Sequence, residues 1–272
     1  MTFLQWYLWG DMINVPQRPG QWGVLHISVM LLCVASIVGF YFIVKYSKNK
    51  ERAINIILYS LIGISLFFEV TQRIAYALKM YVYHHSDVAG CNIWWLLLPK
   101  PWCQISTWML IMAVLTKKKF LYNYASISAL LCSLIFFAYP GVGFNSENCV
   151  MYFDLYSIST HAILLTASIT LITLKRTDFR YKGIWKVAIC FALTVIYALI
   201  QVYVLKIAQD PLYFMPGGDI QAGILGIPYG LYLFLYIALI LIFFNAFYLI
   251  NDRKNVKNAF GKLFKKNKTA SE

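Results

Sequence analysis

Two side chains that could support covalent chemistry lie within long apolar runs of the sequence. Cys103 follows two prolines in the segment LPKPWCQIS, and His161 lies in the segment YFDLYSISTHAILL. A cysteine at the start of a helix, near backbone N–H groups without partners, can act as a nucleophile, and a histidine can accept its proton. The two residues therefore indicate a thiol–imidazole centre, with plain helix packing as the alternative interpretation of both.

A second set of polar residues could hold a charged or polar group. Glu69 and Arg73 are four residues apart with the acid first, which is the favourable order for an ion pair on a helix. One interpretation is mutual neutralisation, which allows both to be buried. The other is that the planar fork of Arg73 also holds a lipid phosphate or a developing anion. The positions at which we expect substrate binding are His26, Glu69, Arg73, Gln104, Gln201 and Tyr229.

Seven apolar runs must position these residues. The chain is 60% hydrophobic and 13% charged, a composition that excludes an ordinary soluble domain. Each run is long enough to cross a hydrocarbon layer of about 30 Å as a helix. We therefore predict an all-α, polytopic membrane protein whose transmembrane domain covers residues 1–250. Its seven helices are expected near 23–45, 53–79, 94–116, 120–139, 152–174, 184–206 and 223–249.

The basic residues predict the orientation of these helices. Nineteen of the 24 Lys and Arg residues follow the first, third, fifth and seventh runs. Under the positive-inside rule this places the N-terminus outside and the C-terminus in the cytoplasm, as in a multi-pass protein of a cell membrane. The same rule accounts for the net charge of +13, so no nucleic-acid partner is expected.

With this orientation, the polar residues of the apolar runs share one depth. A buried polar cluster in one leaflet predicts a cavity that opens outward or sideways into the outer leaflet. Eight such residues would lie in the outer halves of six helices, namely His26, Glu69, Arg73, Cys103, Gln104, His161, Gln201 and Tyr229.

The basic tail, residues 251–272, has its own pattern. Val256, Phe260, Leu263 and Phe264 recur at helical spacing among lysines. The pattern favours an amphipathic helix that lies on the inner membrane face and binds anionic inner-leaflet lipid. A disordered positive tail that only fixes topology is the alternative.

The segments outside the membrane leave two questions open. Cys91 and Cys149 are both expected outside, where they could form a disulfide or remain two free thiols. His84, His85 and Asp87 are crowded for a metal site, so we favour a solvated loop there and expect neither metal nor cofactor.

Several segments together resemble a known group of membrane proteins. GQWGVLHISVMLL with His26, FFEVTQRIAYAL with Glu69 and the helix with His161 are similar to the corresponding segments of the YwaF-like bacterial integral membrane proteins. LPKPWCQIS resembles their Leu-Pro-x-His-x-Cys motif, with Pro99 and Cys103 in place. The segment DPLYFMPGGDIQAGILGIPYGLY resembles their loop before the last helix, which ends in Pro–Tyr. The eukaryotic relatives of this group are transmembrane phospholipid acyltransferases.

The resemblance implies a cysteine-dependent acyl transfer between membrane phospholipids. Cys103 would take an acyl chain from a phospholipid and pass it to a lyso-lipid or similar acceptor, with His161 as the base. Pro101 stands where the family motif has histidine, so this chain would need another base, act on a different substrate or lack the activity.

Two other classes of seven-helix protein are considered beside the enzyme. A retinal protein needs a buried lysine in its last helix, and the run 223–249 has none; the signature motifs of G-protein-coupled receptors are also absent. A transporter, or a lipid- or solute-binding protein without catalysis, would use Glu69, Arg73 and His161 to bind a polar solute or couple protons. It is the alternative to the acyltransferase.

Overall fold

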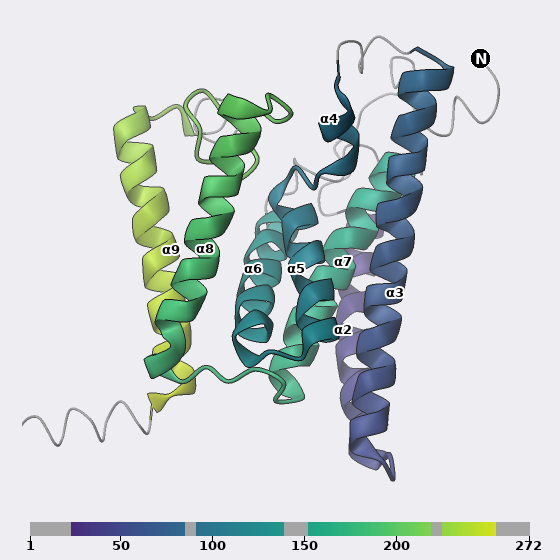
Figure 1. Cartoon of the computed structure of the whole chain (residues 1–272). Helices are drawn as coiled ribbons and strands as arrows, with labels where there is room; N and C mark the ends of the chain where they lie inside the picture. The colour runs from purple at the N-terminus through teal and green to yellow at the C-terminus, as the bar shows by residue number, and fades with distance from the viewer. Residues whose placement is uncertain (1–22, 85–90, 139–151, 219–224, 254–272) are drawn as a thin grey trace, which may run out of the picture.

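The computed structural model of the chain describes residues 23–84, 91–138, 152–218 and 225–253, and these residues fold into helices and connecting turns (Figure 1). The elements are α2 (Val24–Tyr46), α3 (Lys50–Ala77) continued by the π-helix η2 (Leu78–Val82), α4 (Ile93–Leu97), α5 (Trp102–Thr116), α6 (Lys119–Ala138), α7 (Tyr152–Thr173), the 3-10 turn η5 (Tyr181–Gly183), α8 (Ile184–Leu199) continued by the π-helix η6 (Ile200–Val204), and α9 (Tyr229–Asn251).

Six of the described helices are long and apolar enough to cross a membrane. They are α2, α3 with η2, α6, α7, α8 with its flanking turns, and α9. α5 is also apolar but has only 15 residues, a length of about 22 Å at 1.5 Å per residue. The prediction of an all-helical, multi-pass membrane protein is confirmed for the described residues, whereas the seventh span and the positions of the termini stay predictions.

The prediction of one continuous helix over 94–116 is wrong. The structure divides this segment into α4 and α5, with Leu98–Pro101 between them. A residue that precedes proline is pushed out of the helical region, and Leu98 has an extended backbone with ψ 142°. Pro101 then serves as the N-cap residue of α5. The two prolines therefore place the start of a helix at depth, next to Cys103.

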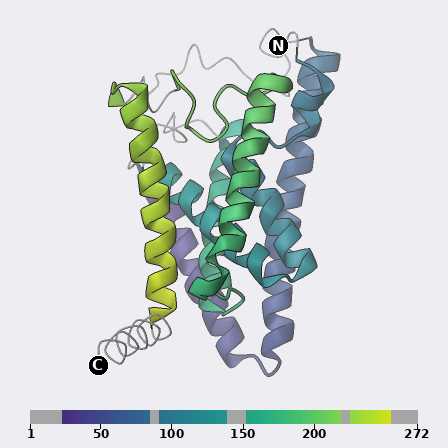
Figure 2. The same ribbon diagram turned by 60° about the vertical axis from the view of Figure 1, so that its left-hand side comes forward.

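The bundle is organised around α6. Its closest packing partners are α5 and α7, while α2 and α3 lie against α7. The membrane-length window of α6 is 67% buried, compared with 17% for α9, which lies at one edge of the bundle in Figures 1 and 2. Small buried residues such as Ala125, Ser126 and Ala129 allow this close approach of α6 to its neighbours.

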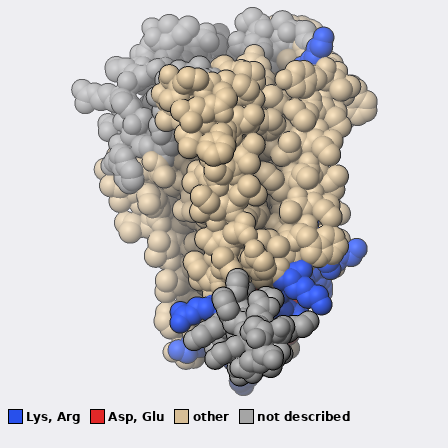
Figure 3. Space-filling model, turned by 90° about the vertical axis from the view of Figure 1, so that its left-hand side faces the viewer, with Lys and Arg blue, Asp and Glu red and all other residues tan. Residues whose placement is uncertain are grey.

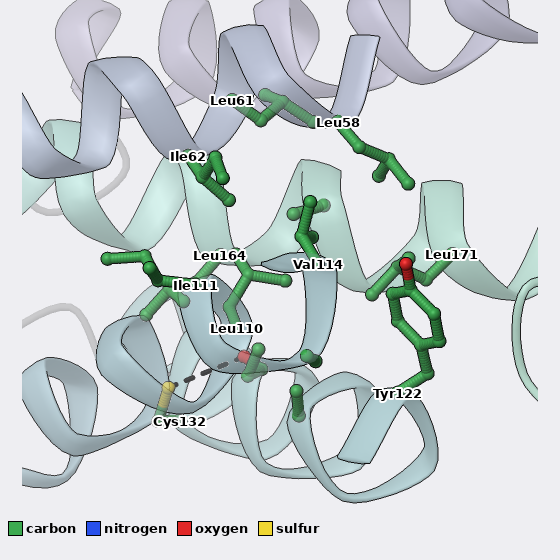
Figure 4. Close-up of a cluster of buried hydrophobic side chains, with 14 of the residues drawn as sticks. Leu58, Leu61, Ile62, Leu110, Ile111, Val114, Tyr122, Cys132, Leu164 and Leu171 are labelled. Carbon is green, nitrogen blue, oxygen red and sulfur yellow. Dashed lines mark hydrogen bonds between the residues drawn. The ribbon is translucent and has the colours of Figure 1, made fainter. Parts of the chain in front are cut away.

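Branched aliphatic side chains from α3, α5 and α7 fill the centre of the bundle (Figure 4). Leu58 and Leu61 of α3 face Leu110 and Val114 of α5, and Leu164 of α7 closes the cluster. All five are buried, Leu110 and Leu164 completely. Because lipid tails are as apolar as these side chains, close packing rather than exclusion of water holds them together.

The basic residues mark one end of the bundle. In Figure 3 most of the visible Lys and Arg side chains gather at the end where α9 finishes, and one group lies at the opposite end.

Two further predictions fall on residues that the structure does not describe. Cys149 is one of these residues, and the basic tail after Arg253 is the other such segment, whereas Cys91 is described and is a free cysteine.

Candidate functional site

The start of α5 presents the thiol of Cys103 beside backbone N–H groups of the first helical turn. In the first turn of α5, the N–H of Trp102 donates to the carbonyl of Pro211 at 2.9 Å, and the N–H of Ile105 donates to that of Pro101 at 3.1 Å. The N–H groups of Cys103 and Gln104 are directed at the sulfur of Cys103. N–H groups at a helix start favour negative charge nearby.

Cys103 and His161 line the same cavity. It has a volume of about 280 Å³ and lies between the start of α5, the last turns of α3, and α6 and α7. Pro101, Gln104 and Cys132 contribute further wall residues. The remaining lining residues are Gln72, Tyr76, Trp102, Ile135, Phe136, Tyr156, Ser157 and Tyr213. Apolar walls with a few polar groups are typical of ligand pockets.

His161 is fixed on α7 in one orientation. Its Nδ1 lies 2.8 Å from the carbonyl oxygen of Ser157, one turn earlier, and its ring stacks on Phe136 with centroids 3.7 Å apart. Because a carbonyl oxygen only accepts, Nδ1 must carry the proton. In the neutral ring this leaves a lone pair on Nε2, which is the form that a general base requires.

The thiol of Cys103 and the imidazole of His161 are not hydrogen-bonded to each other. The only hydrogen bond that His161 makes in the described structure is the one to Ser157. The two cysteines of the cavity differ in exposure, although both line one pocket: Cys103 is half-buried, whereas Cys132 is buried and its thiol already donates to the carbonyl of Ala129 at 3.4 Å.

A saturated polar network centred on Glu69 adjoins this cavity. Oε2 of Glu69 accepts from Arg73 at 2.6 Å and from the indole of Trp108 at 3.0 Å, and Oε1 accepts from the hydroxyl of Tyr156 at 2.7 Å. Nε of Arg73 also donates to the carbonyl of Leu97 at 3.3 Å. The guanidinium lies 5.6 Å from the Trp108 ring centre. The predicted Glu69–Arg73 ion pair is thus confirmed.

Gln104 joins this network to the start of α5. Its side-chain amide donates to Oε1 of Gln72 at 2.7 Å and to the hydroxyl of Tyr156 at 3.1 Å. Its oxygen accepts from the N–H of Lys100 at 2.9 Å. Gln104 therefore holds the proline break against α3 and α7, which positions the neighbouring Cys103.

The other predicted binding residues lie away from the cavity wall. Gln201 is completely buried and donates to the carbonyl of Pro99 at 2.8 Å, which braces the proline break from η6. Tyr229 donates to the carbonyl of Phe214 at 3.2 Å. His26 is buried against α6 and stacks on Phe137 with centroids 6.0 Å apart. Their role in binding substrate stays a prediction.

Sequence reasoning missed Tyr156, Trp108 and Cys132 as members of this region. Trp108 follows Gln104 by four residues, so both lie on one face of α5, and this spacing was an available signal. Tyr156 and Cys132 carried no such signal, because their proximity depends on how α6 and α7 pack.

No group of three or more potential metal ligands is present in the described part of the chain, and His85 and Asp87 lie outside it.

These features define a multi-pass membrane protein with a mainly apolar cavity, carrying a few polar groups, near the break in its third apolar run. The chain matches the model of the TMEM164 family over residues 21–248 and belongs to this family. Neither the curated proteins nor the solved structures contain a match.

Proposed function

We propose that this protein is a membrane-embedded acyltransferase in which Cys103 carries the acyl group and His161 acts as the base. The observation that carries the proposal is the shared cavity, which brings a half-buried thiol at a helix start and a histidine with a fixed tautomer to one wall. The resemblance of LPKPWCQIS to the Leu-Pro-x-His-x-Cys motif, and the further kinship to YwaF-like proteins and transmembrane phospholipid acyltransferases, belong to this proposal.

In the proposed first step, the sulfur of Cys103 attacks the ester carbonyl of a phospholipid. The S–C bond forms, the ester C–O bond breaks, and a lyso-phospholipid leaves with its hydroxyl restored. The thiol proton passes to Nε2 of His161 and then to the leaving oxygen. The N–H groups of Cys103 and Gln104, which are directed at the sulfur, would stabilise the oxyanion. An acceptor hydroxyl then attacks the thioester, and the thiol is regenerated.

In the Leu-Pro-x-His-x-Cys motif of the YwaF-like proteins, Pro101 of this chain stands at the position of the histidine. The proposed mechanism therefore takes its base from another element. His161 meets this requirement because its Nδ1 is held by Ser157, which leaves Nε2 for proton transfer. Since the thiol and the imidazole are not in direct contact, the proton would cross through a water molecule in the cavity.

A transfer assay with the purified full-length protein tests this function. The donor is phosphatidylcholine with one labelled acyl chain, and the acceptor is a lyso-phospholipid. We expect Cys103→Ala to abolish transfer and Cys132→Ala, which removes the other thiol of the same cavity, to retain it. Equal activity of both variants and of the unchanged protein would overturn the proposal.

The second candidate is a lipid- or solute-binding protein without catalysis, including a transporter. The observation that favours it is the absence of a hydrogen bond between Cys103 and His161 in the described structure. This function requires that the cavity bind a lipid without any transfer of label, and that Cys103→Ala leave this binding unchanged.

A further inference from the structure

A second pocket lies at the basic end of the bundle, where α6 begins and α8 begins. Its volume is about 350 Å³. Four of its lining residues are cationic, namely Lys119, Arg180, Lys182 and Lys186, and Asp178 is the one carboxylate among the described lining residues. Membrane topology explains why basic residues are at this end. It does not explain why they surround a shaped hollow.

The loop that forms the pocket is held in place by specific hydrogen bonds. The side chain of Asn123 is buried on α6 and makes two bonds to the backbone of Asp178, donating to its carbonyl at 2.6 Å and accepting from its N–H at 2.7 Å. On the other side, Tyr181 donates its N–H to Asp252 and its hydroxyl to Asn245, each at 2.8 Å.

An aromatic contact fixes the same loop to α9. Phe179 is buried edge-on against Phe247 and Tyr248, with ring centroids 4.8 and 5.4 Å away. The pocket is therefore pre-organised, because α6 and α9 hold the loop from both sides. A loop that served only as a positive signal for topology would need none of these contacts.

The charge of the pocket is left largely unneutralised. Arg180 occupies both oxygens of Asp178, at 2.7 to 3.0 Å. Lys119, Lys182 and Lys186 are exposed and make no ion pair with the acids of the described residues. Three ammonium groups around one hollow attract an anion with several oxygens, and phosphate is the anion that lysines commonly bind in proteins.

We propose that this pocket binds a phosphate-bearing anion, and that its source is the headgroup of an anionic phospholipid. Trp185 lines the pocket and is 56% exposed, beside Lys186, and this combination is typical of the boundary between headgroups and water. Basic pockets between membrane helices at such a boundary bind anionic headgroups. The site shares no lining residue with the cavity of Cys103, and it does not depend on the proposed transfer reaction.

Native mass spectrometry of the full-length protein in detergent, titrated with phosphatidylglycerol, tests this site. The pocket variant is Lys119→Gln/Lys182→Gln/Lys186→Gln. The matched control is Lys45→Gln/Lys50→Gln/Lys117→Gln, which removes the same charge from the same end without touching the pocket. We expect phosphatidylglycerol binding to weaken about tenfold or more in the pocket variant and less than about twofold in the control.

A third variant tests the role of the carboxylate. Asp178→Asn keeps the backbone bonds to Asn123 while releasing Arg180, so we expect phosphatidylglycerol to bind about threefold more tightly.

Equal losses of phosphatidylglycerol binding in the two triple variants would show general charge attraction and overturn the proposed site. Inorganic phosphate is titrated as competitor. Displacement of the lipid at matching concentrations would overturn the lipid headgroup as the source and assign a soluble phosphate instead.

Discussion

The Glu69 network and the wall of the Cys103 cavity share residues but differ in how completely their polar groups are paired. Both oxygens of Glu69 accept hydrogen bonds, and Arg73, Trp108 and Tyr156 each donate to them. At the cavity wall, by contrast, His161 uses only one ring nitrogen in a hydrogen bond of the described structure. A saturated network stabilises the fold, whereas groups left unpaired at a cavity are available for a substrate.

Gln104 belongs to both regions and shows how one supports the other. Its side chain donates to Gln72 and Tyr156 and accepts from the N–H of Lys100, which uses both N–H donors and one of the two acceptor positions of its amide. Because Gln104 is adjacent to Cys103 in the chain, the hydrogen bonds that hold Gln104 also fix the position of the thiol. The variants below separate these two contributions, beginning with the largest effect.

Removing Glu69 should break the network. In Glu69→Ala the partly buried Arg73 loses its counter-ion, and we expect the free energy of unfolding in detergent to fall by about 3 kcal/mol. The matched control is Glu51→Ala, since Glu51 is 71% exposed and pairs with Arg176 at the surface. Its loss should stay below about 1 kcal/mol. Similar small losses for both variants would mean that the network contributes little to stability.

Replacing His161 should affect transfer far more than stability. In His161→Asn the amide can still donate to the Ser157 carbonyl, but the base is gone, so we expect transfer to fall by about 10²–10⁴-fold. Loss of the stack on Phe136 should cost only about 1 kcal/mol of unfolding free energy. His84→Asn is the control, because His84 is exposed with φ 48°, a backbone that asparagine tolerates. Unchanged transfer in His161→Asn would remove His161 from the mechanism.

Removing one hydroxyl of the network should have an intermediate effect. Tyr156→Phe leaves Oε1 of Glu69 without its donor, so we expect a loss of about 1–3 kcal/mol in the free energy of unfolding. Tyr197→Phe is the matched variant. Its acceptor, the carbonyl of Pro99, keeps a second donor in Gln201, and a loss of about 1 kcal/mol or less is expected. Reversal of this order would contradict the central place of Glu69.

The smallest effect is expected from pH at the basic end. The guanidinium of Arg180 holds the pKa of Asp178 below its ordinary value of 3.8. A depressed carboxyl pKa adds stability that is present above pH 3.8 and is lost as the pH falls through the lower, folded-state pKa. Unfolding of the unchanged protein and of Asp178→Asn should therefore differ by less than about 1 kcal/mol near pH 6, and the difference should shrink toward pH 3. A difference that grows on acidification would be inconsistent with this pairing.

The sequence predicts the apolar elements well because lipid imposes a strong constraint on length and composition. The runs near 23–45 and 120–139 appear as α2 and α6, within two residues at each end. For the run 94–116, the start of a helix beside Cys103 is confirmed, but the segment before the two prolines forms the separate short helix α4. The last helix begins at Tyr229, after Pro228, rather than at 223.

For the site, spacing along one helix could be predicted and packing between helices could not. The Glu69–Arg73 pair follows from a separation of four residues. The partners from other helices, Trp108 and Tyr156, depend on which faces of α5 and α7 meet α3. The common cavity of Cys103 and His161 likewise required the packed bundle.

Mass spectrometry of the Cys103 peptide tests the acyl-enzyme most directly. The purified protein is incubated with phosphatidylcholine and analysed before and after treatment with hydroxylamine, and the peptide with Cys132 serves as the internal control from the same cavity. The proposed mechanism predicts an acyl mass on Cys103 that hydroxylamine removes, with Cys132 unmodified. A Cys103 that stays unmodified, or equal acylation of both cysteines, would contradict a thioester intermediate at Cys103.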